Sequence, residues 1–252
     1  MPNWPIDFID HILCGDCLDL MRFIPDKSID MILADLPFGV TQNHWDSVIP
    51  FDPLWIAYKR IIKDHGAIVL MAVNPFAAQL IGSNLDMFRY DLVWCKNKST
   101  GFLNAKKMPM RKHELILVFY KKLPIYNPQK TQGHEPAHAY TKHTSDGTNY
   151  GETKIGWKGG GQTDRYPTSL IQIPVMNNDH PDKKHSVQKP IALFESLVRT
   201  YTNVGMLVLD NVIGLGTTAL AATNTGRHFI GMDKDPLFCD EARDRIERHK
   251  RK

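Results

Sequence analysis

The sequence predicts an α/β fold with a mostly parallel central sheet and helices on both faces. Short apolar runs of the kind that form buried strands alternate along most of the chain with runs of helical periodicity. Two of the predicted strands lead directly into acidic residues, Asp35 and Asp210. Strand–helix alternation brings the carboxyl ends of parallel strands to one edge of a sheet, where ligands bind in such folds. That edge is therefore the predicted functional site.

Both halves of the chain show the alternation. In the first half we expect strands near 12–14 and at 29–34, 67–71, 90–95 and 114–120, with helices near 17–23 and at 53–63 and 75–84. In the second half we expect helices at 189–202, 217–225 and 236–248, with strands at 206–210 and 228–232. The two sets predict one domain over residues 1–252, with residues 123–187 as an irregular insertion.

Composition is typical of a globular protein, with 42% hydrophobic and 23% charged residues in a chain of 252. The sequence shows neither a leader pattern nor an apolar run of membrane-spanning length, so we expect a cytoplasmic protein without membrane contact. Four cysteines suit reduced thiols in that compartment. Cys14 and Cys17 form a single CxxC without a partner pair, which we interpret as coincidence.

The segment after the strand at 29–34 suits an amine-bearing ring. The Asp35 carboxylate and the Leu36 backbone carbonyl are two acceptors for the two N–H groups of an exocyclic amine. Pro37 stiffens the turn, and Phe38 offers a ring for stacking, as in pockets that bind a flipped base. An acidic turn with Phe38 in the core is the alternative, and this segment alone does not separate the two.

A second segment favours a nucleotide-like ligand. The strand at 206–210 is followed by a turn containing Gly214 and Gly216, then by a helical run and a strand that ends at Asp233. This βαβ layout lets a backbone approach a ligand and places a carboxylate for ribose hydroxyls. The turn lacks a third glycine and a phosphate-binding lysine. A ribose ligand without phosphate, such as S-adenosylmethionine, therefore fits better than a dinucleotide, and a turn without any ligand is the alternative.

In their order along the chain, these segments resemble the amino-methyltransferases of DNA. The resemblance is carried by Asp35-Leu36-Pro37-Phe38, Asp210 with Gly214-Leu215-Gly216-Thr217-Thr218, and Gly231-Met232-Asp233. The catalytic segment precedes the cofactor glycines, as in the permuted β class, and Leu in the tetrapeptide is frequent in phage and prophage adenine methyltransferases. The resemblance spans roughly residues 11–122 and 185–247. It implies a Rossmann-like methyltransferase fold in which strands 206–210 and 29–34 are neighbours.

The resemblance also implies a set of cofactor residues. Asp16 would contact the cofactor adenine, Asp233 the ribose, and the segment Gln188-Lys189-Pro190 would lie near the methionine end. Asn211-Val212 stands where the family usually has Pro-Phe, so an aromatic cover over the cofactor is missing. The predicted S-adenosyl-L-methionine site comprises Asp16, Lys189, Pro190, Asp210, Gly214, Gly216, Thr217, Thr218 and Asp233.

Basic residues concentrate in one stretch although the net charge is only +4. Eight Lys or Arg residues lie between Lys96 and Lys122, against a single acid, Glu114. With Phe102 and Asn104 nearby, the stretch suits a groove that contacts DNA phosphates, and a merely solvated face is the alternative. The predicted DNA contacts are Lys106, Lys107, Arg111 and Lys112.

Two less regular segments complete the interpretation. In the family, the stretch corresponding to residues 123–187 is the target-recognition region, and loop 40–50 could fold over a flipped base. Within the first segment, His134-Glu135-Pro136-Ala137-His138 matches a zinc-protease pattern that works only on a helix. Pro136 argues against a helix there, so we expect no metal.

The predicted function is site-specific transfer of a methyl group from S-adenosyl-L-methionine to the N6 amine of adenine in double-stranded DNA. Adenine is preferred because Asp35 stands where related cytosine-N4 enzymes more often have Ser. Three alternatives stay open: a DNA cytosine-N4 methyltransferase, an RNA-directed relative of these enzymes, or a non-catalytic DNA-binding relative. The resemblance also allows a homodimer, which is common in the β class.

Overall fold

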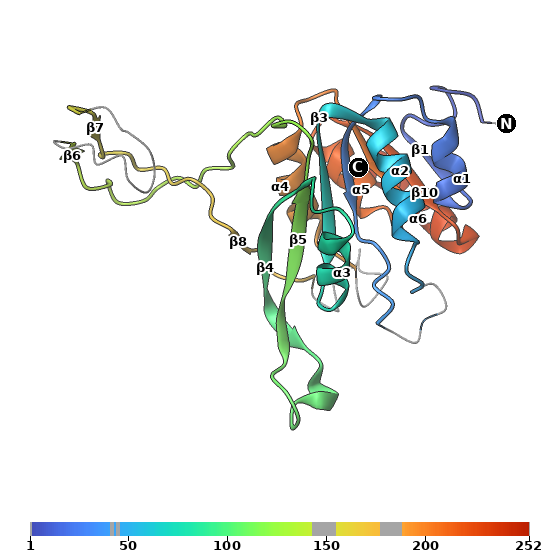
Figure 1. Cartoon of the computed structure of the whole chain (residues 1–252), viewed down its shortest axis with the longest axis horizontal. Coiled ribbons are helices and arrows are strands. Elements are labelled where there is room, and N and C mark those ends of the chain that lie inside the picture. Colours follow the sequence, from blue (N-terminus) through green and yellow to red (C-terminus); the bar gives the residue numbers. More distant parts are fainter. Residues whose placement is uncertain (1, 41–42, 44–45, 143–154, 177–187, 252) are drawn as a thin grey trace. The chain divides into compact units, whose positions relative to one another are not determined.

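A computed structural model describes residues 2–40, 43, 46–142, 155–176 and 188–251 (Figure 1). The chain divides into two compact units. The main unit comprises Met1–Asn127 and Ser169–Lys252, and the smaller one comprises Pro128–Thr168.

The main unit is built on an eight-stranded sheet in the order β1-β10-β9-β2-β3-β5-β4-β8. Its strands are β1 (His11–Cys14), β2 (Ile29–Ala34), β3 (Ile62–Ala72), β4 (Phe88–Thr100), β5 (Arg111–Phe119), β8 (Leu170–Gln172), β9 (Leu207–Asp210) and β10 (His228–Asp233). All neighbouring pairs are parallel except the two that involve β5. The mostly parallel sheet predicted from the sequence is confirmed, and β2 and β9 are neighbours as expected.

Helices cover both faces of this sheet (Figure 1). They are α1 (Cys17–Leu20), α2 (Phe51–Ile61), α3 (Phe76–Gly82), α4 (Ile191–Tyr201), α5 (Thr217–Asn224) and α6 (Pro236–Lys250), with short 3₁₀ turns at Met21–Phe23 and Phe102–Asn104. Alternate β2 side chains enter different cores: Ile32 and Ala34 pack in the cluster that contains α2 and α3, whereas Met31 and Leu33 pack with α4. This alternation explains why β2 reads as a continuous apolar run.

Two strands, β3 and β4, extend furthest beyond the bounds that the sequence predicts. β3 begins at Ile62 rather than residue 67, because its charged first half pairs irregularly with β2 before the apolar half begins. β4 continues to Thr100 rather than residue 95, through the exposed polar residues 97–100. Both extensions are mostly polar, so hydrophobic periodicity does not reveal them. The β4–β5 hairpin extends beyond the rest of the sheet (Figure 1).

The smaller unit is largely irregular. It contains a two-stranded ribbon of β6 (Tyr140–Thr141) and β7 (Lys158–Gly159), and Lys130 pairs with Asp164 at 2.9 Å. Residues 134–138 are not helical, as Pro136 predicts. Within the predicted insertion, β8 belongs to the main sheet, where it pairs with β4. Its three residues are too few to give a strand signal.

In the parts of the chain that the structure describes, none of the helices has the length and apolar character needed to cross a membrane.

Candidate active site

Four acidic residues mark the carboxyl edge of the sheet, at or just after the ends of four strands. Asp35 follows β2, Asp210 ends β9, Asp233 ends β10, and Asp16 lies two residues after β1. Since β1, β10, β9 and β2 are consecutive parallel neighbours, the four carboxylates lie along one edge. The predicted approach of the Asp35 segment to the glycine turn is thus confirmed at the level of the strands.

The turn after β2 is fixed from both sides. The Leu36 side chain is buried in the core, and the Phe38 ring lies 5.3 Å from the Phe76 ring, centroid to centroid. On the other side, Asp46 accepts a hydrogen bond from the Gly39 backbone N–H at 2.8 Å and one from the next N–H at 2.9 Å. The backbone that presents the Asp35 carboxylate is therefore held by packing and by a second carboxylate.

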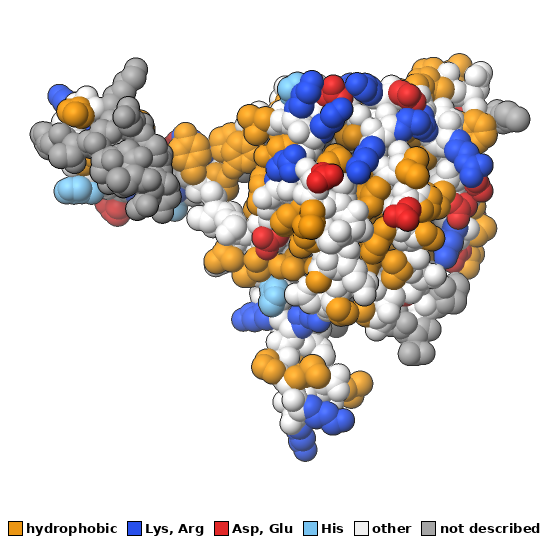
Figure 2. All heavy atoms as spheres, viewed as in Figure 1, with side chains coloured by type: hydrophobic (Ala, Val, Ile, Leu, Met, Phe, Trp, Pro, Cys, Tyr) orange, Lys and Arg blue, Asp and Glu red, His pale blue; other side chains and the backbone are white. Residues whose placement is uncertain are grey.

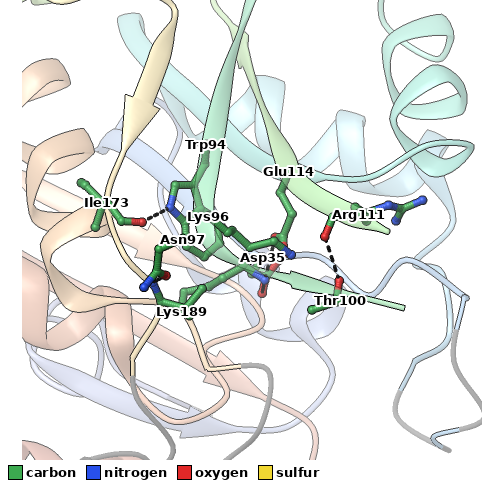
Figure 3. Close-up of polar contacts among 10 residues, drawn as sticks. Asp35, Trp94, Lys96, Asn97, Thr100, Arg111, Glu114, Ile173 and Lys189 are labelled. Carbon is green, nitrogen blue, oxygen red and sulfur yellow. Dashed lines mark hydrogen bonds and ion pairs between the residues drawn. The ribbon is translucent and has the colours of Figure 1, made fainter. Parts of the chain in front are cut away.

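A chain of alternating charges starts at Asp35 (Figure 3). The Lys189 ammonium lies 2.8 Å from Asp35 Oδ2 and 3.1 Å from Glu114 Oε2. The Lys96 ammonium lies 3.1 Å from Glu114 Oε1. Both lysine side chains are almost entirely enclosed, at 5% exposed for Lys96 and 10% for Lys189. Two carboxylates thus meet two ammonium groups, the balance that buried charges require.

The other oxygen of Asp35, Oδ1, is enclosed by protein and has no hydrogen-bond partner among the described residues. An enclosed acceptor without a donor costs free energy, so native structures rarely leave one. Such an atom is an acceptor that the described residues leave unused, and Glu114 Oε2, which meets Lys189 only as an ion pair, is another carboxylate oxygen of this kind. An exocyclic amine, with two N–H donors, is a partner that suits such an acceptor.

Burial and charge act together on the pKa values in this chain of charges. Burial raises the pKa of Asp35, while Lys189 opposes the rise and Glu114 adds to it. Burial alone would lower the pKa of Lys189, but Asp35 and Glu114 raise it to about 12. Burial also raises the pKa of Glu114, but Lys189 and Lys96 outweigh it and bring the pKa below its ordinary value. Lys189 is therefore protonated at neutral pH and faces both carboxylates.

The predicted cofactor turn is organised by two carboxylates. Asp210, which is 3% exposed, accepts a hydrogen bond from the Val212 N–H at 3.0 Å and another from the Thr218 hydroxyl. Asp233 accepts from the Gly214 N–H at 2.9 Å and from the Asp235 N–H at 3.0 Å. The two acids hold the backbone between β9 and α5 in one conformation.

Glycine is required at two positions in this region. Gly216 has φ +78°, a conformation that side chains disfavour, and it caps α5. At Gly231 an added Cβ would lie 2.4 Å from the Ile12 side chain. Gly214, at φ +48°, has open space where a side chain would be.

The geometry of this turn fits S-adenosyl-L-methionine. The open space at Gly214 allows a ligand to approach the backbone. Each oxygen of Asp233 accepts one N–H, and an ionised carboxylate has about four acceptor positions, so acceptors are left for ribose hydroxyls. Asp16 is exposed, and it lies beside this site because the neighbouring Gly15 N–H donates to the Asp233 carbonyl at 2.8 Å. Thr217 and Thr218 are buried.

The sequence also predicts Lys189 and Pro190 near the cofactor. The structure gives the Lys189 ammonium two carboxylate partners, one on β5 and one just after β2. Pro190 is buried and is the N-cap residue of α4. Their position ties the start of α4 to the Asp35 turn.

The predicted DNA contacts lie on the β4–β5 hairpin, where Lys106, Lys107, Arg111 and Lys112 are all exposed. Figure 2 shows basic and apolar side chains together at the end of this hairpin. Phe102 is 78% exposed and Leu103 is 96% exposed. In the predicted loop 40–50, residues 41–42 and 44–45 lie outside the described residues, as do 143–154 and 177–187 in the predicted recognition region.

Sequence reasoning missed several residues of the site. Glu114 and Lys96 stood out only as members of a basic stretch, although a single acid among eight basic residues is a signal that could have found them. Asn211, interpreted only as the loss of an aromatic neighbour, is buried and accepts a hydrogen bond from the Tyr58 hydroxyl. Asp46 carries no sequence signal of its own.

Comparisons with known proteins point to one family. A family model described as DNA methylase matches residues 29–244. Among curated proteins, the chain is 27% identical over 277 residues to the type II methyltransferase M.HinfI of Haemophilus influenzae, covering 95% of this chain and 69% of that protein. It is 26% identical over 269 residues to the type II methyltransferase M.BglII of Bacillus subtilis, with the same coverage.

Solved structures share the fold. The M1.HpyAVI–SAM complex superimposes with a TM-score of 0.58 at 19% identity, covering 93% of this chain and 97% of that one. The cytosine-N4-specific PvuII DNA methyltransferase superimposes with a TM-score of 0.66 at 16% identity, covering 93% and 85%. The predicted Rossmann-like methyltransferase fold is confirmed.

Proposed function

The chain belongs to the DNA methylase family, an enzyme family that methylates DNA with S-adenosyl-L-methionine, and on that premise we propose that it methylates the N6 amine of adenine. The proposal rests on the surroundings of the Asp35 carboxylate. This carboxylate has one oxygen on Lys189 and one enclosed oxygen without a partner among the described residues. The turn thus offers an acceptor that the folded chain does not use.

Three groups of this turn would position the base. Asp35 Oδ1 and the Leu36 backbone carbonyl accept the two amine N–H groups, and the Phe38 ring stacks on the base. An adenine amine is a poor nucleophile because its lone pair is delocalised into the ring. Two acceptors on its protons favour a more tetrahedral nitrogen with an available lone pair and stabilise the positive charge that develops there.

The cofactor supplies an electrophilic methyl group on a sulfonium. In the transfer, the nitrogen lone pair forms the new N–C bond, the electrons of the S–C bond stay on sulfur, and one amine proton passes to solvent. The residues that would bind the cofactor are Asp233 at the ribose, Asp16 at the adenine, and the backbone of the turn at Gly214–Gly216. Asp210, Thr217 and Thr218 would shape that turn, and Lys189 and Pro190 would close the methionine end.

Adenine, rather than cytosine, is the proposed target because the first residue of the catalytic segment is Asp35. The related cytosine-N4 enzymes more often carry Ser there. Cytosine-N4 methylation is the competing outcome of the test below.

Double-stranded DNA would be bound by the β4–β5 hairpin and read by the predicted recognition region at 123–187. Lys106, Lys107, Arg111 and Lys112 would contact phosphates, which attract basic side chains regardless of sequence. By extension from the type II methyltransferases to which the chain is similar, we place it in restriction–modification of DNA in the cytoplasm. The homodimer stays a prediction.

Nucleoside analysis tests the proposal. The protein is expressed in a host without DNA methylation, and its DNA is digested to nucleosides and measured by mass spectrometry. We expect N6-methyldeoxyadenosine with the wild-type chain and none with Asp35→Ala. N4-methyldeoxycytidine instead would overturn the choice of base. No methylated nucleoside, with a folded protein that binds the cofactor, would support the non-catalytic alternative.

A further inference from the structure

Glu114 and Lys96 belong to the base of the β4–β5 hairpin rather than to its exposed end. Lys96 lies on β4 and Glu114 on β5, and their side chains meet at 3.1 Å beside Asp35 (Figure 3). The Trp94 indole N–H donates to the Ile173 carbonyl at 2.7 Å, which fixes β4 next to this contact. The basic stretch therefore contains two different sets of lysines, and Lys96 is buried while those at the hairpin end are exposed.

Lys189 has two carboxylate partners, and the second one limits where its ammonium can lie. A lysine side chain is long and flexible, and a single carboxylate partner leaves its direction weakly defined. Glu114, on β5, provides a second ion-pair partner, with its Oε2 at 3.1 Å from the ammonium. With both contacts made, the ammonium occupies Asp35 Oδ2, and Oδ1 is the oxygen left for a substrate.

We propose that Glu114 and Lys96 are positioning residues for methyl transfer: Glu114 holds the Lys189 ammonium on Oδ2 of Asp35, and Lys96 balances the charge of Glu114. This inference rests on the proposed role of Asp35 and adds two residues to its site. Neither residue touches the reacting atoms.

The charges around Asp35 predict the direction in which each variant changes the ionisation of Asp35. Asp35 and Glu114 are negative, and Lys189 and Lys96 are positive, so the four charges cancel. The other charged groups that face Asp35 are Asp46, on the loop after the turn, and Asp210, at the end of β9. Removing the Glu114 charge favours an ionised Asp35, whereas removing the Lys96 charge disfavours it.

The test is the rate of a single turnover of methyl transfer as a function of pH, in the full-length protein with bound cofactor and duplex DNA. Transfer needs ionised Asp35, so the rate falls on the acid side. Glu114→Gln should move this acid limb to lower pH, and Lys96→Met should move it to higher pH. We expect shifts on the order of 0.5 unit, smaller than the roughly 1–3 units that a charge in direct contact produces.

The plateau rate gives a second readout. Glu114→Gln should lower it by about 10- to 100-fold: the Lys189 ammonium stays paired with Asp35 but is no longer confined to Oδ2, and a misplacement of about 1 Å can cost on the order of 100-fold. The double variant Glu114→Gln/Lys96→Met restores the charge balance, so its acid limb should return toward that of the wild type while its plateau stays low. Lys59→Met and Glu241→Gln, both on exposed helix positions, are matched controls that should move neither readout.

Shifts in opposite directions, together with a lowered plateau in both variants that carry Glu114→Gln, support positioning through Lys189. The same shifts with a wild-type plateau would mean that the two charges act on Asp35 only through their field, and would overturn the positioning role. If the single variant Lys96→Met does not fold, the proposal is still tested by whether the double variant returns the acid limb from its Glu114→Gln position toward that of the wild type. Variants that fold and bind cofactor normally but leave the acid limb unchanged would overturn the proposal. If Asp35→Ala itself methylates DNA at the wild-type rate, the proposed function fails instead, so the two failures are distinct.

Discussion

The two halves of the carboxyl edge hold their carboxylates in different ways. In the β9–β10 half, Asp210 and Asp233 accept hydrogen bonds from backbone N–H groups and from the Thr218 hydroxyl. In the β2 half, Asp35 is held by the Lys189 ammonium, which Glu114 shares. In the β9–β10 half, neutral N–H and O–H donors hold the carboxylates. In the β2 half, ion pairs between side chains of separate elements hold the carboxylate.

This difference suggests a division of labour. Backbone donors fix the shape of the glycine turn, which suits a site that must fit a whole cofactor. Ion pairs instead keep a carboxylate charged inside the protein and leave one of its oxygens to an incoming donor. Changes in the first half should therefore affect mainly cofactor binding or stability, and changes in the second mainly the transfer itself.

The largest effect is expected from Asp35→Ala. It removes the acceptor for the substrate amine, so methyl transfer should fall by at least about 10²-fold, the loss typical of one stabilising group in a transition state. Cofactor affinity, measured by calorimetric titration, should stay within a factor of about 3 of wild type. That is well below the tenfold change that corresponds to about 1.4 kcal/mol of binding free energy. Transfer near the wild-type rate would contradict the role of Asp35.

Asp210 should make stability depend on pH. Burial raises its pKa from 3.8 to about 7, against the hydrogen bonds from Thr218 and the Val212 N–H. Because the folded state keeps this proton to higher pH than the unfolded state, the free energy of unfolding should fall as pH rises from about 4 to about 7. The fall is at most about 4 kcal/mol, at 1.36 kcal/mol per unit.

Asp210→Asn removes this titration. Urea unfolding at several pH values should show a flatter pH dependence for the variant than for the wild type between about pH 4 and 7. Equal slopes for the two proteins would mean that Asp210 titrates normally in the folded chain.

Asp233→Ala should weaken cofactor binding by roughly 1.5–3 kcal/mol, the usual value for hydrogen bonds to a charged group. This loss of binding free energy includes the cost of losing the hydrogen bond from the Gly214 N–H to Asp233, which helps to fix the turn. Calorimetric titration measures it. Unchanged affinity would remove Asp233 from the cofactor site.

The smallest effect is expected on the hairpin, outside both halves. Neutralising Lys106 and Lys107 should weaken binding to cognate and scrambled duplexes alike. It should also flatten the slope of log affinity against log salt by about 0.9 for each DNA phosphate that the variant no longer neutralises. Cofactor affinity should not change. An unaltered salt slope would mean that these lysines are only a solvated face.

The same comparison shows what the sequence could predict. The glycine turn was predictable because its parts are contiguous: a strand, an acid, two glycines and a helix follow one another within β9–α5. The closing acid, Asp233, lies one strand further on. Most of the cofactor half of the edge was therefore predictable from residues that are close together in the sequence.

The network around Asp35 was not predictable in the same way. Glu114 and Lys189 are 75 residues apart in the sequence. They meet because β5 inserts antiparallel beside β3 and because α4 begins next to the β2 turn, neither of which a local pattern reveals. The polar ends of β3 and β4 were missed for a related reason, since pairing rather than burial makes them strands.

The most direct test of this division is the rate of methyl transfer as a function of cofactor concentration. For Asp233→Ala the rate should approach the wild-type plateau once the cofactor saturates the weakened site. For Asp35→Ala it should stay low at every cofactor concentration. If both variants instead recover together, or both stay low in folded protein saturated with cofactor, the two halves of the edge do not have separate roles.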